Sequence, residues 1–139
     1  MVRINLIDPR NLADQHLVAE YDEILMLVAH VRKYPFARDV PEKYCLGKGH
    51  IRFFKNKLKY LEKRHELLKK EMKKRGFRAG KTVNLKGLPK GLVNDWKPSG
   101  RDKKIIRKRI IQKIKQKPGF YRYCKEHKQF RFFLELTKN

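Results

Sequence analysis

The sequence lacks the features that mark membrane and secreted proteins. It contains no apolar run long enough to cross a bilayer and no signal peptide. It has only two cysteines, Cys45 and Cys124, which lie far apart and form no CxxC pair. This arrangement favours two free thiols in a reducing compartment over a disulfide or a cysteine-based metal site. We therefore expect a cytoplasmic protein that does not associate with membranes.

Common catalytic and cofactor signatures are also missing. No P-loop, GxGxxG motif or Ser-His-Asp pattern is present. Asp14, Glu20 and Glu23 could be imagined around Mg²⁺, but Asp14 and Glu23 are more than two helical turns apart and cannot share one ion. We therefore expect no metal and no cofactor. The histidines are expected to have packing or hydrogen-bonding roles, except His16, which aligns with Glu23 two turns along the same helix.

Acidic residues are scarce, and their distribution is uneven. The chain has 37 Lys and Arg against 14 Asp and Glu, a net charge of +23. Residues 1–34 nevertheless carry four bases and five acids, which leaves 33 bases and 9 acids on residues 35–139. The cationic body predicts phosphate neutralisation and a nucleic-acid partner. The acid-rich N-terminal helix does not serve that purpose, so its acids need another explanation.

The apolar spacing predicts three main helices. The first begins at Asp8 as N-cap with Pro9 in its first turn and ends near Tyr34, before Pro35. The second is expected over residues 51–75 with Gly76 after it, and the third over residues 102–115. Their inward stripes are Leu17, Tyr21, Ile24, Val28 and Val31; Phe54, Leu58, Leu61, His65, Leu68 and Met72; and Ile106, Ile110 and Ile114. Glu23 precedes Ile24 and should therefore lie at the border of the core.

The remaining segments are expected to be loops. Residues 35–49 and 77–101 are interrupted by glycine and proline, and the tail from Gly119 is aromatic and basic. That tail has two open interpretations: it stacks on bases, or it covers the core. The fold class is therefore all-α: a compact single domain over residues 1–139, with three main helices, long loops and the N-terminal segment packed between helices.

Three collinear blocks of residues resemble a known family. They are Arg3-Ile4-Asn5-Leu6 with Leu12-Ala13-Asp14-Gln15-His16-Leu17, Ala19-Glu20-Tyr21 and Glu23; Leu46-Gly47, Gly49-His50, Phe53-Phe54 and Lys74-Arg75-Gly76-Phe77; and Gln116-Lys117-Pro118 with Phe120-Tyr121-Arg122-Tyr123. These blocks are similar to the phage-type pyrimidine-dimer DNA glycosylases with AP lyase activity, which act in the repair of UV damage.

The resemblance implies a mechanism and a set of site residues. The nucleophile would be the α-amine of Val2, exposed by removal of Met1, and Glu23 would be the catalytic carboxylate. The partner would be damaged double-stranded DNA, bound by a monomer in the nucleoid. The implied DNA-binding residues are Arg3, Gln15, His16, Lys81, Thr82, Arg109, Lys113, Tyr121 and Arg122. Asp14 and Glu20 are expected to be structural.

The sequence departs from the family at two positions beside the implied carboxylate. Asp22 and Met26 stand where the phage member has arginines that contribute to lesion binding. One alternative is therefore a glycosylase or AP lyase for another lesion. A second alternative, a non-catalytic basic nucleic-acid-binding protein, accounts for the net charge but not for the acids of the first helix.

Overall fold

The computed structural model describes residues 2–138, which are mostly helical, as the sequence predicts. Its helices are η1 (Pro9–Asn11, a 3-10 helix), α1 (Asp14–Lys33), α2 (His50–Phe54), α3 (Leu58–Lys74), η2 (Lys90–Leu92, also 3-10), α4 (Gly100–Gln116) and α5 (Phe130–Thr137). Two short strands, β1 (Arg122–Tyr123) and β2 (Glu126–His127), pair antiparallel. Within this described part no helix is both long and apolar enough to span a membrane.

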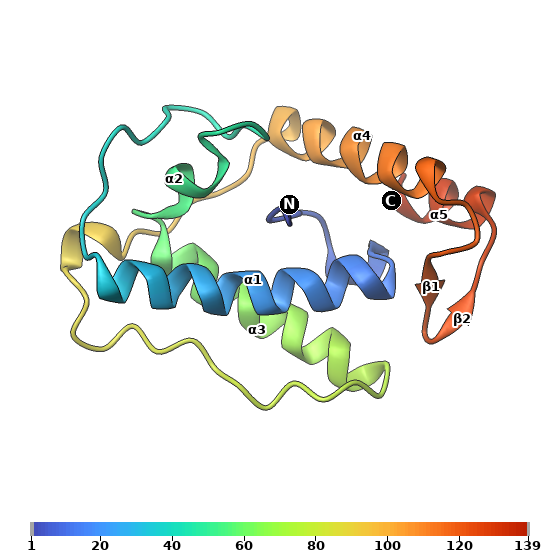
Figure 1. Ribbon diagram of the computed structural model, residues 1–139, viewed down its shortest axis with the longest axis horizontal. Helices are drawn as coiled ribbons and strands as arrows, with labels where there is room; N and C mark the ends of the chain where they lie inside the picture. The colour runs from blue at the N-terminus through green and yellow to red at the C-terminus, as the bar shows by residue number, and fades with distance from the viewer. Residues whose placement is uncertain (1, 139) are drawn as a thin grey trace.

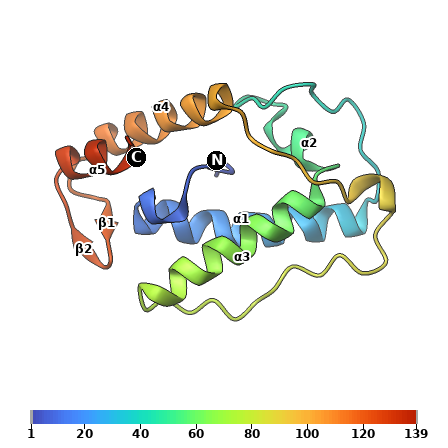
Figure 2. The same cartoon turned by 180° about the vertical axis from the view of Figure 1, so that it is seen from behind.

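The helices are arranged around the N-terminal segment. Figure 1 shows α1 crossing the front of the molecule with α4 above it, and the N-terminal segment between the two. Helix α3 packs against α1 and lies in front of it when the molecule is seen from behind (Figure 2). Helix α5 packs against α4, and the strand pair connects these two helices. The N-terminal segment therefore has helices on several sides.

The predicted inward stripes are confirmed. All five stripe residues of α1 are buried, as are all six that fall on α2 and α3 and the three isoleucines of α4. Burial of these apolar side chains is the main favourable term in folding. Lysines and arginines occupy much of the outward surface of α3 and α4. Each of these helices therefore has one apolar face toward the core and one cationic face toward solvent.

The predicted start of the first helix at Asp8 is wrong. Asp8 does cap a helix, since its carboxylate accepts the Arg10 N–H at 2.9 Å, but that helix is only η1. The Arg75 guanidinium then binds the carbonyl oxygens of Pro9 (3.1 Å) and Leu12 (2.8 Å). The helix does not continue because Leu12 (φ −103°, ψ 142°) and Ala13 (φ −62°, ψ 154°) have extended backbone, and α1 begins at Asp14.

The single helix predicted over residues 51–75 is also wrong, because it is interrupted between α2 and α3. Lys57 has φ −126° and ψ 42°, outside the helical region. Asn94 from the following loop donates its side-chain amide to the Asn56 carbonyl at 2.8 Å, and the Trp96 ring packs edge-on against Phe53 at 5.1 Å. The loop that contains Asn94 and Trp96 therefore provides a hydrogen-bond donor for the backbone and an apolar cover for Phe53 at the break.

The C-terminal tail has more structure than was predicted. It contains the strand pair and the amphipathic helix α5, whose Phe133 and Thr137 are buried. The third helix extends from Gly100 to Gln116, two residues earlier and one later than expected. Its earlier start follows from a capping box formed by Ser99 and Asp102. Of the two interpretations of the tail, the structure supports core covering, since Tyr121 and Phe133 belong to the core.

Candidate active site

Side chains from three helices and a loop hold the N-terminal segment in place, and no neighbouring strand pairs with it among the described residues. The Ile4 N–H donates to His50 Nε2 at 2.9 Å, and the Tyr44 hydroxyl donates to the Ile4 carbonyl at 2.9 Å. Arg3 Nε donates to the Leu46 carbonyl at 2.8 Å. His50 Nδ1 lies 2.8 Å from the Cys45 carbonyl, so His50 acts as a neutral donor–acceptor bridge. These bonds fix the position of Val2, the next residue toward the terminus.

A buried ion pair between α1 and α3 also binds the N-terminal segment. The Arg64 guanidinium donates to both carboxylate oxygens of Glu20, at 2.7 and 3.1 Å, and to the Ile7 carbonyl at 2.6 Å. The Asn5 side-chain amide donates to the same carboxylate at 3.0 Å. Glu20 is completely buried. It thus connects α1, α3 and the N-terminal segment, in agreement with the structural role expected for it.

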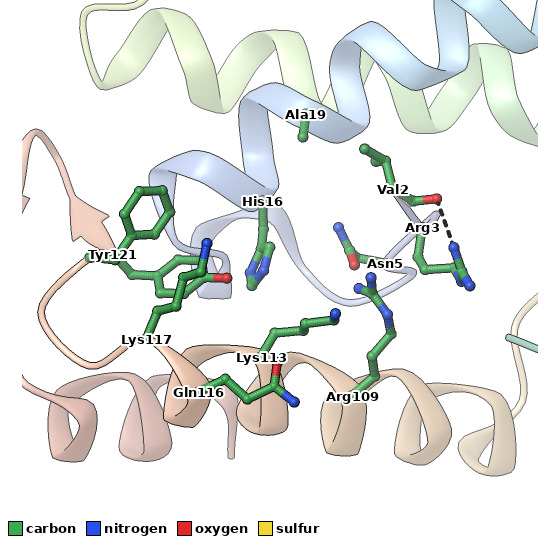
Figure 3. Close-up of a pocket in the computed structure, with 11 residues that line it drawn as sticks. Val2, Arg3, Asn5, His16, Ala19, Arg109, Lys113, Gln116, Lys117 and Tyr121 are labelled. Carbon is green, nitrogen blue, oxygen red and sulfur yellow. Dashed lines mark hydrogen bonds between the residues drawn. The ribbon is translucent and has the colours of Figure 1, made fainter.

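Val2 lies at a cavity of about 280 Å³ between the N-terminal segment, α1 and α4. Figure 3 shows side chains of α4 projecting toward those of α1 and of the N-terminal segment. The lining residues are Val2, Arg3, Asn5, His16, Ala19, Arg109, Lys113, Gln116, Lys117, Phe120 and Tyr121. Five of these are predicted DNA-binding residues and one is the predicted nucleophile. The structure therefore brings residues 2, 3, 16, 109, 113 and 121 together.

The cavity is strongly cationic. Its lining contains two arginines and two lysines but no Asp or Glu. Burial, together with the positive charges of Arg109 and Lys113, lowers the pKa of His16 from 6.5 to about 4. His16 is therefore neutral at pH 7, and its buried Nδ1 has no hydrogen-bond partner among the described residues. A group that carries negative charge and accepts hydrogen bonds is the ligand that this lining favours.

Glu23 lies on α1, one turn beyond the cavity residue Ala19. It is half-buried, which confirms the expected position at the border of the core. Burial raises the pKa of this carboxyl group, and the positive charge of Arg3 opposes the rise. The only carboxylate predicted to be catalytic is thus partly desolvated and interacts electrostatically with a residue of the cavity.

The other predicted residues lie outside the cavity. Gln15 and Arg122 line a neighbouring groove, which shares Ala19 with the cavity and also includes Asp22. Lys81 and Thr82 belong to the loop after α3 and line neither hollow. The Lys81 backbone N–H donates to the Tyr21 hydroxyl at 2.9 Å, while Thr82 accepts a hydrogen bond from Lys69.

Several lining residues were absent from the sequence-based prediction. Asn5, Gln116, Lys117 and Phe120 all border the cavity. The signal was present, because all four fall within the blocks that carry the family resemblance. Asn5 Oδ1 is buried without a hydrogen-bond partner among the described residues. No group of three or more His, Cys, Asp or Glu suited to a metal ion occurs in residues 2–138.

The cationic cavity is suited to bind the phosphates of a nucleic acid next to Val2. Cations on two sides of the cavity would neutralise phosphates, and a partly desolvated carboxyl group lies close by. In a comparison with known families, the family model described as pyrimidine dimer DNA glycosylase matches residues 1–85. The matched region contains the N-terminal segment, α1 and α3, but not α4 or Tyr121.

Proposed function

The chain belongs to the pyrimidine dimer DNA glycosylase family, and from this premise we propose that it couples base excision to strand cleavage through one covalent imine. The nucleophile is the α-amine of Val2, freed when Met1 is removed. The observation that carries the proposal is the place of Val2 at an acid-free cationic cavity, with Glu23 one turn from its wall.

The α-amine suits this reaction better than a lysine would. An α-amine titrates near pH 8 and a lysine near 10.4, so about a tenth of the α-amine is neutral and nucleophilic at pH 7. Arg3, Arg109 and Lys113 surround the same cavity, and their charges disfavour the protonated amine. The bonds to Ile4 and Arg3 hold the adjacent backbone, so the nucleophile is positioned before substrate binds.

The proposed steps conserve bonds and protons. The Val2 nitrogen attacks C1′ of the 5′ nucleotide of the dimer, and the C1′–N bond breaks as the base leaves with the electron pair. One amine proton passes to the departing base. The C1′–O4′ bond of the sugar ring then breaks, its oxygen takes up the second amine proton, and an imine remains between C1′ and the Val2 nitrogen. Removal of a 2′ proton then expels the 3′ phosphate by breaking the C3′–O bond. This β-elimination is the AP lyase step.

Glu23 is proposed as the group that stabilises the cationic sugar or iminium and helps to remove the 2′ proton. Its partial burial raises its pKa toward the range useful for proton transfer at neutral pH. A role near the sugar gives Glu23 a function in an otherwise cationic protein, whereas Glu20 and Asp14 are engaged in buried ion pairs with Arg64 and Arg75. Arg3, Arg109 and Lys113 bind the flanking phosphates, and release of their counterions drives binding.

Asp22 and Met26 support one second candidate, a family member whose preferred lesion has changed. Both are exposed on α1 beside Glu23, and Met26 retains 59% of its accessible surface. Neither supplies the positive charge that the resembled phage enzyme has there. The alternative predicts cleavage at abasic sites or at another damaged base with weak excision of dimers.

The test is a comparison of two carboxamide variants on the same helix. Glu23→Gln should abolish cleavage of a duplex with one defined thymine dimer and leave the duplex affinity within about twofold. Asp22→Asn is the matched control, because it neutralises the adjacent exposed carboxylate, and it should cleave at the wild-type rate or faster. Near-wild-type cleavage by Glu23→Gln would remove Glu23 from the mechanism.

A further inference from the structure

The aromatic segment of residues 120–125 is fastened to the N-terminal end of α1. The Asp14 carboxylate accepts the backbone N–H groups of Cys124 (3.0 Å) and Lys125 (2.7 Å). These two residues have φ values of 51° and 71°, which non-glycine residues rarely adopt, so the contact with Asp14 stabilises an otherwise unfavourable turn. The Tyr123 hydroxyl donates to the Arg10 carbonyl at 2.8 Å. The segment is therefore held at several points by residues distant in sequence.

Gln15 binds the backbone on both sides of Tyr121. Its side-chain Nε2 donates to the Phe120 carbonyl at 2.8 Å, and its Oε1 accepts the Arg122 N–H at 3.0 Å. One amide side chain thus satisfies the carbonyl of Phe120, before β1, and the N–H of Arg122, the first residue of β1. This pair of bonds uses one of the two N–H groups and one of the two oxygen lone pairs of the amide.

Tyr121, between these two bonds, forms a wall of the cavity. Its ring lies 4.9 Å from the His16 ring, centroid to centroid, and 6.4 Å from that of Phe133 in the core. Only 8% of Tyr121 is exposed, although the flanking Phe120 and Arg122 are both exposed. A shift of the backbone at residues 120–122 would therefore move the ring that covers His16 and change the shape of the cavity.

We infer that Gln15 is a positioning residue that acts on the reaction through Tyr121, in place of the direct DNA contact that the family resemblance implies. The inference rests on the proposed function, since it assigns the cavity to the reacting nucleotide. It also explains how Tyr121, which lies outside the matched region, becomes part of one site with the N-terminal segment.

A double-mutant cycle with single-turnover kinetics tests the inference. Gln15→Ala removes both bonds, and Tyr121→Leu removes the ring that covers His16 while retaining an apolar side chain against Phe133. Two neutral hydrogen bonds correspond to a loss of about tenfold in the rate of borohydride trapping on abasic duplex. Gln112→Ala, an exposed glutamine of α4 outside the cavity, is the matched control and should react at the wild-type rate.

If Gln15 acts through Tyr121, the double variant reacts as slowly as Tyr121→Leu alone, and the affinity for duplex changes little. If the two losses multiply and Gln15→Ala also weakens duplex binding, Gln15 contacts DNA and the inference is overturned.

A second measurement does not depend on activity. Hydrogen exchange at the Arg122 amide, which donates to Gln15, should accelerate about tenfold in Gln15→Ala and remain unchanged in Gln112→Ala. Unchanged exchange would refute the positioning role. Failure of the wild-type protein to form any adduct would instead refute the proposed function, and the exchange result would still decide whether Gln15 holds the segment.

Discussion

Replacing Glu20 by alanine should destabilise the protein strongly although Glu20 cannot touch substrate. The Arg64 side chain is 3% exposed and directs three bonds at Glu20 and the Ile7 carbonyl, two of them to the carboxylate. Without that carboxylate, the guanidinium would be a buried charge with no counter-ion. Breaking such a pair on one side costs about 3–5 kcal/mol, a large share of the roughly 5–15 kcal/mol that stabilises a typical domain.

Urea unfolding at pH 7, followed by helical circular dichroism, measures this loss directly. Asp22→Ala is the matched control, because Asp22 is an exposed acid on the same helix, and it should change the unfolding free energy by less than about 0.5 kcal/mol. The double variant Glu20→Leu/Arg64→Met removes both charges and should recover most of the loss. A loss below about 1 kcal/mol in Glu20→Ala would refute the assignment of this pair as the support of the N-terminal segment.

Three further predictions concern pH and DNA binding. Burial lowers the pKa of His50 from 6.5 to about 4, so its contribution to stability is complete above pH 6.5 and is lost as the pH falls toward 4. Urea titrations should show that the free energy of unfolding falls by roughly 3 kcal/mol across that pH range. His50→Gln should remove this part of the pH dependence of stability. Arg109→Ala should reduce the slope of log affinity for DNA against log salt concentration by about one. Lys115→Ala, on α4 outside the cavity, is the control and should change this slope less. Equal slopes for the two variants would remove Arg109 from the DNA-binding surface. Asp22→Arg should tighten binding to undamaged and dimer duplexes and steepen the salt dependence by about one, as measured by fluorescence anisotropy; unchanged affinity would mean that DNA does not pass over this part of α1.

The helix interiors could be predicted from the sequence because period and burial agree there. The stripe from Leu17 to Val31 is buried along its whole length, and Ile106, Ile110 and Ile114 line one side of α4. Helix ends were less predictable, because distant residues determine them. Nothing near Pro9 or Leu12 in the sequence indicates that Arg75 will bind their carbonyl groups.

The break before α3 illustrates the same limit. The apolar spacing continues from Phe54 to Leu58 without interruption, so periodicity alone favours one helix. The interruption depends on Asn94 and Trp96, which reach Asn56 and Phe53 only in the folded chain. The tight turn at Cys124 and Lys125 likewise depends on Asp14, more than a hundred residues away.

The candidate site was predictable where the family resemblance covered it. Val2, Arg3, His16, Arg109, Lys113 and Tyr121 meet at one cavity, although charge patterning alone could not have selected Arg109 among so many bases. Gln15 was selected for a DNA contact, and nothing in the sequence indicated that its amide would also bind the backbone of residues 120 and 122. Residue type indicates what a side chain can bind, whereas the fold determines which partner is within reach.

Borohydride trapping tests the central claim most directly. Protein with Val2 at its terminus is mixed with a duplex that contains one thymine dimer, with abasic and undamaged duplexes alongside and a variant carrying one extra residue before Val2. The account predicts a covalent adduct on dimer and abasic DNA, mapped by mass spectrometry to the Val2 nitrogen, and none with the extended variant. An adduct on abasic DNA alone would indicate a changed lesion preference. An adduct on a lysine, or an undiminished yield from the extended variant, would contradict the α-amine mechanism.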